Sequence, residues 1–531
     1  MGKRGGAIAG FIPARVALGR NETLMIPAAS ATRTAPVERN PSFNAECVAS
    51  AVDVKHAIRE RLLLGAMVAA IAICYLAFLS PGHVFVNDDF AAYLMHAKNL
   101  VEGHLYTDIR YIPNPDAMWL SPTSGYPPVY PIILAPVYRL FGLNLRAFKF
   151  VTALCFVVFL ALFSEFARSE LGFFPTAVVL FVLAFNPIFW DQRNIILSEF
   201  PYVMFSFAAL LAINKTYEAL DPHRVRVGSV LLTSALLYCA YGTRTIGIAL
   251  VFALIAADLA RFRRPRRFLI AVLALTAFFI VSQSLLMTSP GSYIRIFHFS
   301  FHTLALNAIY YSKTLSYVWQ NGYSKQVQIV FALLFTALAT LNFGRSLWKE
   351  RGAKEFYLLG YVAVLTAWNA QIGLRGLLPV LPLYFLYGFQ EVGRIFVNAR
   401  PAVRIGAIAA MAAVASLSYA GQFRQEATVA AEPDVTDTGA QEMFAFVRAH
   451  TSPNATLAFP KPRTLALFTA RTVGALSPNQ TPAQCIKFMT DIHSNILIDP
   501  DWSRTPLGNA LESSGAKALF RNNGYRIYKV Y

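Results

Sequence analysis

Residues 88–103 read DDFAAYLMHAKNLVEG, and they follow the first long apolar stretch of the chain, near 62–79. Apolar side chains recur at helical spacing after the two acids, which predicts an amphipathic helix. One aspartate here can be explained as a helix cap, because a carboxylate accepts hydrogen bonds from the first N–H groups of a helix. A second acid is not needed for capping, and paired acids at a membrane surface suggest a functional site.

The composition is that of a membrane protein. Of 531 residues, 56% are hydrophobic and 14% are charged, whereas a soluble domain carries about 25% charged residues. The net charge of +18 does not indicate nucleic-acid binding, because the basic residues lie mainly in short loops between apolar stretches. The five cysteines are scattered and form neither a disulfide framework nor a zinc-binding spacing. We expect the lipid bilayer, and no nucleic acid, as a partner.

Long apolar stretches predict an all-α polytopic membrane protein with about eleven transmembrane helices and at most about thirteen. The least certain pair is joined at Gly242-Thr243-Arg244. The predicted spans lie near 62–79, 146–166, 173–190, 201–214, 227–242, 245–260, 268–287, 326–343, 356–371, 377–392 and 404–421.

Lysine and arginine predict the orientation of these helices. The loop 261–267 reads RFRRPRR, and three further basic loops lie at 215–226, 345–354 and 394–404. With eleven spans and a cytoplasmic N-terminus, all four basic loops fall on the cytoplasmic side, as the positive-inside rule requires. The segment 127–142 is apolar but short and broken by prolines, so we interpret it as re-entrant or interfacial.

Three domains are predicted: a flexible cytoplasmic segment 1–55, a transmembrane module 56–424 and a small periplasmic α/β domain 425–531. The first segment lacks the apolar core of a cleavable signal peptide. In the last domain we expect helices near 439–449 and 463–470, an extended run near 455–459, and a hairpin of 516–520 with 525–531. We also expect juxtamembrane helices in the first outer loop.

Several short motifs follow the Asp-Asp pair in order. The pair itself continues as Tyr-Leu-x-x-Ala-x-Asn-Leu-x-x-Gly from Tyr93 to Gly103. The later motifs are SGYPP at 124–128, ILSEFP at 196–201, RTIG at 244–247 and RGLLPVLP at 375–382. Over residues 60–395 this ordered set resembles the GT-C glycosyltransferases, and most of all the branch of protein O-mannosyltransferases and bacterial lipid A aminoarabinose transferases.

The resemblance implies a glycosyltransferase of the bacterial inner membrane with a periplasmic active site. Its donor would be a polyprenyl-phosphate sugar, and its acceptor a hydroxyl of an envelope glycan, lipid or protein. The family pair is usually Asp-Glu, so the match leaves open which aspartate is the general base: spacing to Tyr93 favours Asp89, and position in the pair favours Asp88. The aminoarabinose and mannosyl branches imply no catalytic metal, whereas the oligosaccharyltransferase branch implies one, and the Asp88-Asp89 pair does not decide between them. We predict no cofactor and no metal site.

Carboxylates and arginines at outer span ends are the other candidate site residues. Glu199 would orient the acceptor or the first aspartate, or else be a helix N-terminal acid. Arginine forks suit phosphate oxygens, although snorkelling also explains arginines at this depth. The residues that we expect to bind substrate or the donor phosphate are Arg244, Arg375, Tyr93, Tyr126 and, more weakly, Arg193.

Two alternatives stay open at this point. A transporter or flippase of a lipid-linked sugar would need ionisable residues near the bilayer midplane, and the predicted spans hold almost none. The aromatic loop 288–325 is an interfacial helix pair, a mobile flap over the donor, or both. His298 and His302 in this loop are four residues apart, but no third metal ligand is evident nearby.

Overall fold

The structure is a computed structural model that describes residues 41–85, 88–116, 125–219, 226–286, 299–320, 322–428 and 432–531. It divides into two compact units, Met1–Ile58 and Arg59–Tyr531. Residues 1–40 of the predicted N-terminal segment lie outside the described residues, and 41–55 are the start of helix α1 (Pro41–Ala77). Ser124, Tyr293, Phe297 and His298 also lie outside the described residues.

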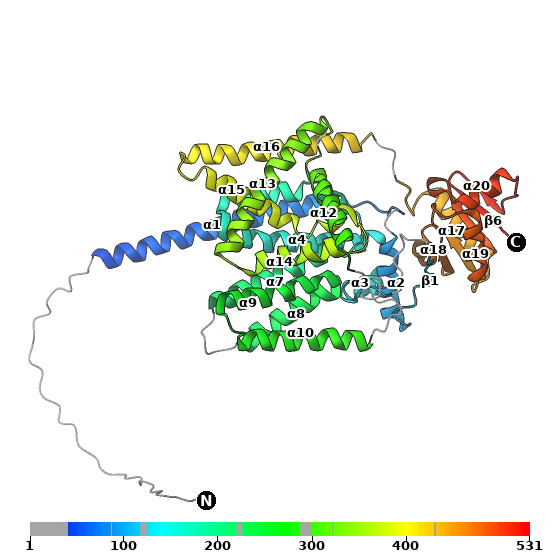
Figure 1. The fold of residues 1–531 in the computed structure, drawn as a ribbon, viewed down its shortest axis with the longest axis horizontal. Coiled ribbons are helices and arrows are strands. Elements are labelled where there is room, and N and C mark those ends of the chain that lie inside the picture. The colour runs from blue at the N-terminus through cyan, green and yellow to red at the C-terminus, as the bar shows by residue number, and fades with distance from the viewer. Residues whose placement is uncertain are drawn as a thin grey trace, which may run out of the picture. The chain divides into compact units, whose positions relative to one another are not determined.

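The chain is a multi-pass membrane protein built almost entirely of helices (Figure 1). Among the described residues, six stretches are long and apolar enough to cross a bilayer. They are Lys55–Ala77 of α1, Leu145–Leu171 (α4), Thr245–Phe262 (η1 and α9), Arg267–Leu285 of α10 (Arg267–Leu286), Lys325–Lys349 (α13) and Pro401–Glu426 (α16).

The other predicted spans correspond to shorter or less apolar helices, so the total of eleven stays a prediction. These helices are α5 (Phe173–Ala184), α6 (Pro187–Gln192), α7 (Glu199–Ala219), α8 (Val227–Thr243), α14 (Ala353–Ala367) and α15 (Leu381–Ile395). The predicted span 173–190 is two helices, because Asn186 caps α6 and Pro187 occupies its first position.

The first outer loop forms α2 (Asp89–Glu102), strand β1 (Tyr111–Ile112) and α3 (Val129–Phe141). Helix α3 has 13 residues and contains Pro136, and this length reaches about 20 Å. The hydrocarbon core is about 30 Å thick, so α3 is too short to cross it alone. It packs against α2 and α4, in keeping with its interpretation as a juxtamembrane helix.

The aromatic loop is partly helical. Helix α12 (Phe301–Ser316) is followed by a single 3₁₀ turn, η2 (Tyr317–Trp319). Phe301 is 80% exposed, whereas Trp319 is 1% exposed and donates a hydrogen bond to the Tyr384 hydroxyl at 3.0 Å. The end of this loop is therefore anchored in the helix bundle.

The C-terminal residues form a small α/β domain with the predicted elements (Figure 1). The predicted helices appear as α17 (Thr438–His450) and α18 (Pro462–Thr469), and the hairpin as β5 (Phe520–Arg521) with β6 (Tyr525–Lys529). The remaining elements are β2 (Thr456–Phe459), β3 (Thr472–Ala475), α19 (Pro482–Asp491), β4 (Ile496–Pro500), η4 (Asp501–Ser503) and α20 (Pro506–Ser513).

The sheet of this domain includes a strand from the first outer loop. Its order is β1-β3-β2-β4-β6-β5. The first four strands pair in parallel, and β6 pairs antiparallel with both of its neighbours, β4 and β5. Strand β1 pairs with β3 through Tyr111 and Val473. The two regions also share one apolar core, in which Phe85 and Phe90 pack with Phe444 and Phe459. The first outer loop and the C-terminal domain therefore fold as one body.

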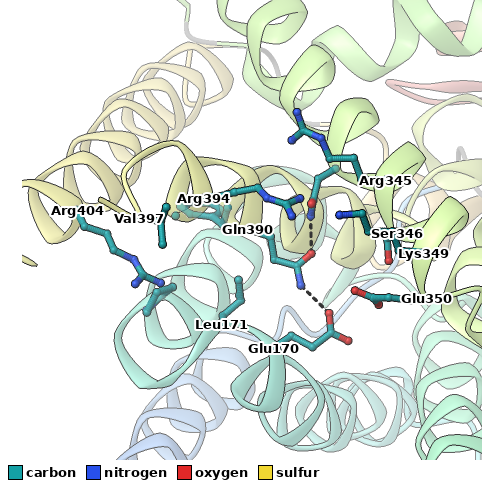
Figure 2. A pocket seen from close by; sticks show the side chains of 14 residues that line it. Glu170, Leu171, Arg345, Ser346, Lys349, Glu350, Gln390, Arg394, Val397 and Arg404 are labelled. Atoms are coloured by element: carbon teal, nitrogen blue, oxygen red, sulfur yellow. Dashed lines mark hydrogen bonds between the residues drawn. The ribbon is translucent and has the colours of Figure 1, made fainter. Parts of the chain in front are cut away.

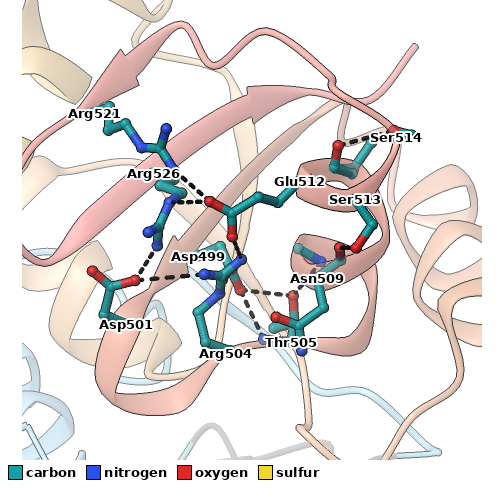
Figure 3. A network of polar contacts seen from close by, with 12 residues as sticks. Asp499, Asp501, Arg504, Thr505, Asn509, Glu512, Ser513, Ser514, Arg521 and Arg526 are labelled. Carbon is teal, nitrogen blue, oxygen red and sulfur yellow. Dashed lines mark hydrogen bonds and ion pairs between the residues drawn. The ribbon is translucent and has the colours of Figure 1, made fainter.

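Ion pairs join the second half of this domain (Figure 3). Asp499 at the end of β4 is fully buried; it accepts hydrogen bonds from the Thr505 backbone and hydroxyl at 2.7 and 2.8 Å, and pairs with Arg504 at 2.8 Å. Glu512 of α20 pairs with Arg504 at 2.7 Å and Arg526 at 3.2 Å. These bonds tie α20 to the sheet.

Candidate active site

Helix ends bring two acids and two arginines together at one end of the bundle. Asp89 begins α2, Glu199 begins α7, Arg244 joins α8 to η1, and Arg375 lies in the 3₁₀ turn η3 (Gly373–Gly376) before α15. These positions follow from the sequence, because apolar helices carry their charged residues at the membrane boundary. We call these four residues and Arg463 the Asp–Arg cluster.

Glu199 connects the two arginines Arg244 and Arg375. Its Oε1 accepts hydrogen bonds from Arg244 Nη1 at 2.6 Å and from Arg375 Nε at 2.8 Å. Arg375 then extends to Asp89 Oδ2, 3.4 Å from its Nη1. The Glu199 side chain is 1% exposed, so its charge depends on these two arginines. The predicted contact of Glu199 with the aspartate pair is thus made through Arg375.

The two aspartates have different surroundings. Asp88 is 6% exposed, and its carboxylate accepts hydrogen bonds from the backbone N–H groups of Arg463 and Thr464, at 3.2 and 2.7 Å. These are two of the first N–H groups of α18, so Asp88 caps that helix and makes no side-chain cap bond to its own helix α2. Burial raises the pKa of Asp88, against the opposing effects of Arg463 and Thr464.

Asp89 faces the arginines. Its Oδ1 accepts hydrogen bonds from the Tyr126 hydroxyl at 2.7 Å and from Arg463 Nη1 at 3.0 Å. Burial acts to raise the pKa of Asp89, but the guanidinium groups of Arg375 and Arg463 outweigh it and hold the pKa below its ordinary value. Asp89 is therefore ionised at neutral pH.

Arg463 is the cluster member that the sequence did not reveal. It comes from α18 in the C-terminal domain, its side chain is 2% exposed, and its guanidinium lies 4.5 Å from the centre of the Tyr111 ring. The only sequence signal is its place in a short helix beginning Pro462-Arg463. The C-terminal domain thus contributes a side chain to the site.

The predicted tyrosines lie beside the cluster. The Tyr93 hydroxyl is 2.9 Å from Ser198 Oγ, and Ser198 Oγ in turn accepts from Arg244 at 3.4 Å. Tyr126 is held by His96, whose Nε2 accepts the Tyr126 N–H at 3.2 Å. Burial lowers the pKa of His96 to about 4, so the ring is neutral and can accept this bond.

Arg193 is placed differently from the other predicted arginines. Its Nε donates to the Phe78 carbonyl at 3.2 Å, and its guanidinium lies 3.8 Å from the centre of the Trp190 ring. Among the described residues it makes no hydrogen bond or ion pair with the Asp–Arg cluster.

Exposure decides which groups a ligand can reach. The side chains of Asp89, Arg375 and Arg244 are 29%, 28% and 19% exposed, whereas Glu199 and Arg463 are buried. One carboxylate and two guanidinium groups therefore form the open face, and the buried acid and arginine fix their positions. In the part of the chain that the structure describes, no three His, Cys, Asp or Glu side chains gather as a metal site.

No protein-family model and no curated protein matches this sequence. Solved structures do match its fold. ArnT from Cupriavidus metallidurans bound to undecaprenyl phosphate aligns with a TM-score of 0.51 and 12% identity, over 88% of this chain and 97% of that one. The Archaeoglobus fulgidus oligosaccharyltransferase in complex with Zn and sulfate aligns with a TM-score of 0.56 and 11% identity, over 82% and 68%.

The chain has the GT-C fold. A third match, the Archaeoglobus fulgidus oligosaccharyltransferase AglB in complex with an inhibitory peptide and a dolichol-phosphate, has a TM-score of 0.54 and 12% identity, over 83% of this chain and 69% of that one. The fold predicted from the ordered motifs is thereby confirmed. At these identities the GT-C likeness concerns the fold alone.

Proposed function

We propose that this protein is a glycosyltransferase that moves a sugar from a polyprenyl-phosphate donor to a hydroxyl group. The observation that carries the proposal is the open face of the Asp–Arg cluster, where the Asp89 carboxylate lies next to Arg375 and near Arg244. Such transfer needs a base for the acceptor proton and cations for a phosphate leaving group. Two structural neighbours were solved with undecaprenyl phosphate or a dolichol-phosphate bound, which supports a lipid phosphate as the ligand.

In this proposal Asp89 is the general base. It takes the proton of the acceptor hydroxyl while the hydroxyl oxygen bonds to the anomeric carbon of the sugar. The bond between that carbon and the phosphate oxygen breaks, and the lipid phosphate leaves with the electron pair. Arg375 and Arg244 bind the phosphate oxygens and stabilise the charge that develops there.

Asp88 is the less suitable base because three hydrogen bonds already occupy most of its acceptor sites. Its carboxylate accepts bonds from Arg463 N, Thr464 N and the Thr464 hydroxyl, the last at 2.7 Å. Protonating or removing this group would leave the first turn of α18 without its cap. Asp88 is therefore a positioning residue that holds Arg463 against Asp89.

Donor binding would also activate the base. Before the donor binds, Arg375 lies 3.4 Å from Asp89 and lowers its pKa, which weakens it as a base. The donor phosphate, a diester with one negative charge, competes for the same guanidinium. As Arg375 turns to the phosphate, the pKa of Asp89 rises toward the working range, so its basicity increases only when a donor is present.

We place the reaction on the periplasmic face of a bacterial inner membrane. The basic loops lie at the opposite helix ends from the cluster, and the positive-inside rule assigns those loops to the cytoplasm. The acceptor would be an envelope glycan, lipid or protein. The C-terminal domain, which supplies Arg463, lies next to the open face and is suited to select it.

The deciding experiment measures label lost from radioactive polyprenyl-phosphate sugars in membranes that contain wild type, Asp89→Asn or Asp88→Asn at matched levels. We expect Asp89→Asn to lower transfer at least 100-fold, the lower end of the usual contribution of a general base, about 10²–10⁴. Asp88→Asn should keep most of its activity per folded molecule but melt at a lower temperature. Loss of transfer in Asp88→Asn alone would reverse the assignment.

Equal consumption of donor in all three proteins would contradict the mechanism. The transporter alternative would then be tested in sealed vesicles by following movement of the lipid-linked sugar across the bilayer. If the lipid-linked sugar crosses the bilayer without transfer to an acceptor, and Asp89→Asn does not change this movement, the protein is a transporter and the transferase proposal is wrong.

A further inference from the structure

A charged cavity lies at the end of the helix bundle away from the Asp–Arg cluster. Its volume is about 330 Å³, and it is lined by the last turns of α4, α13 and α15 and by the start of α16 (Figure 2). Helix α15 connects the two sites, since Arg375 precedes its first residue and Arg394 lies in its last turn. With 15 residues, α15 reaches about 22 Å along its axis, which puts the two sites toward opposite membrane faces.

The cavity carries a surplus of positive charge. Its cations are Arg345, Lys349, Arg394 and Arg404. Arg345 is paired with the buried Glu391. For Lys349, Arg394 and Arg404, the described residues provide no hydrogen bond or ion pair. Three cations around one cavity therefore have no direct ion-pair partner among the described residues.

The acids of the cavity offset the charge of these cations only in part, because both also pair with Lys354. Glu170 lies 2.6 Å and Glu350 lies 3.3 Å from Lys354 Nζ. Glu170 also accepts a hydrogen bond from Gln390 at 2.6 Å, which Figure 2 shows, and Gln390 accepts one from Asn342 at 2.7 Å. The acids and amides form a fixed polar wall, and the unpaired cations remain available to a ligand.

Exposed apolar side chains lie on the same helices as the cavity. Val397 lines the cavity and is 61% exposed, and Ile395 beside it is 56% exposed. Trp348, next to Lys349, is 76% exposed, as is common for tryptophan at a membrane interface. A ligand here would have an anionic group among the cations and an apolar part along these side chains.

We propose that this cavity binds the phosphate group of an anionic membrane lipid. Basic pockets between membrane helices on the cytoplasmic side suit anionic headgroups, and arginine forks match phosphate oxygens. A volume of about 330 Å³ equals that of roughly ten liquid waters at about 30 Å³ each. That is enough for a phosphate and its glycerol, while the acyl chains would lie along Ile395 and Val397. This inference does not depend on the proposed transferase activity.

The test uses full-length protein in detergent, titrated with short-chain phosphatidylglycerol, phosphatidylcholine or inorganic phosphate, and follows thermal melting and lipid retained in native mass spectrometry. We expect phosphatidylglycerol alone to bind. The double variant Arg394→Gln/Arg404→Gln should weaken binding at least about tenfold, since a hydrogen bond to a charged group contributes about 1.5–3 kcal/mol. The control Arg263→Gln/Arg264→Gln removes two exposed arginines of the loop 261–267, outside the cavity, and should bind like wild type.

The exposed Lys349→Gln gives a second readout if the double variant does not fold, and it too should weaken binding. Equal binding by wild type, the control pair and the cavity variants would overturn the proposal. Inorganic phosphate binding as tightly as phosphatidylglycerol would also overturn it, because the ligand would then be a soluble anion.

Discussion

At the scale of single residues, Arg463 shows how a distant segment can set the chemistry of a site. Its guanidinium contacts Asp89 at 3.0 Å and the Tyr126 hydroxyl at 3.1 Å, and it is almost fully buried. A buried cation of this kind is stable only with a nearby acid. Arg463 and Asp89 therefore depend on each other, although 374 residues separate them.

Replacing Arg463 should change the pH dependence of transfer. Burial raises the pKa of Asp89, and Arg375 and then Arg463 lower it, so Arg463→Gln should move the acid limb of kcat/KM to higher pH. Because the pKa of Asp89 is lower in the folded than in the unfolded protein, its ionised carboxylate stabilises the fold above the unfolded pKa, and this stabilisation is lost as the pH falls through the folded pKa. Arg463→Gln should therefore also lower the free energy of unfolding near neutral pH. The control Arg448→Gln removes an exposed arginine. If the acid limb of Arg463→Gln lies at the same pH as that of the control, Arg463 does not lower the pKa of Asp89.

The sequence could indicate Asp89, Glu199, Arg244 and Arg375, because each ends an apolar stretch on the same predicted side of the membrane. It could not separate Asp88 from Asp89. That distinction depends on α18, whose N–H groups engage Asp88 alone. Arg463 could not be found for the same reason, since its partner lies in another domain.

At the scale of elements, two helices approach each other closely at a glycine. Gly388 of α15 faces Phe335 of α13, and a Cβ atom at Gly388 would overlap the Phe335 ring. In α13, Gly344 has nothing within 4 Å of the corresponding position. The two glycines thus provide a matched test of this helix crossing.

Gly388→Ala should destabilise the bundle by about 1–3 kcal/mol, the usual cost of overpacking a core. Gly344→Ala should be neutral or stabilise the protein by up to about 1 kcal/mol, because alanine favours an exposed helix. Thermal melting of the two variants in detergent checks both expectations. Equal melting temperatures would show that α13 can move away from α15.

The apolar stretches of the sequence predicted where the helices lie, but not where each helix ends. The junction at Arg244 is a break between α8 and η1, with Arg244 in an extended conformation at φ −147° and ψ 130°. This break turns the side chain toward Glu199. The split between α5 and α6 depends on a local cap, which a hydropathy pattern does not report.

At the scale of the whole molecule, the predicted topology puts the loop 261–267 and the C-terminal domain on opposite sides of the membrane. Arg263 in that loop and Asn509 in α20 are both exposed. In a background lacking the five native cysteines, an impermeant maleimide added to intact cells with a permeable outer membrane should label Asn509→Cys and not Arg263→Cys. Labelling of both or neither before lysis would contradict the eleven-span topology.

The pairing of β1 with β3 has a consequence for how the protein is made. The ribosome releases Asp89 long before Arg463, and at about 5–20 residues per second their separation of 374 residues corresponds to a delay of roughly 20–75 s. During that time the first outer loop has neither its partner strand nor its buried arginine. Ribosome-bound chains that end before α18 should therefore be inactive intermediates, and completion of the last domain is the step that switches on the nascent protein.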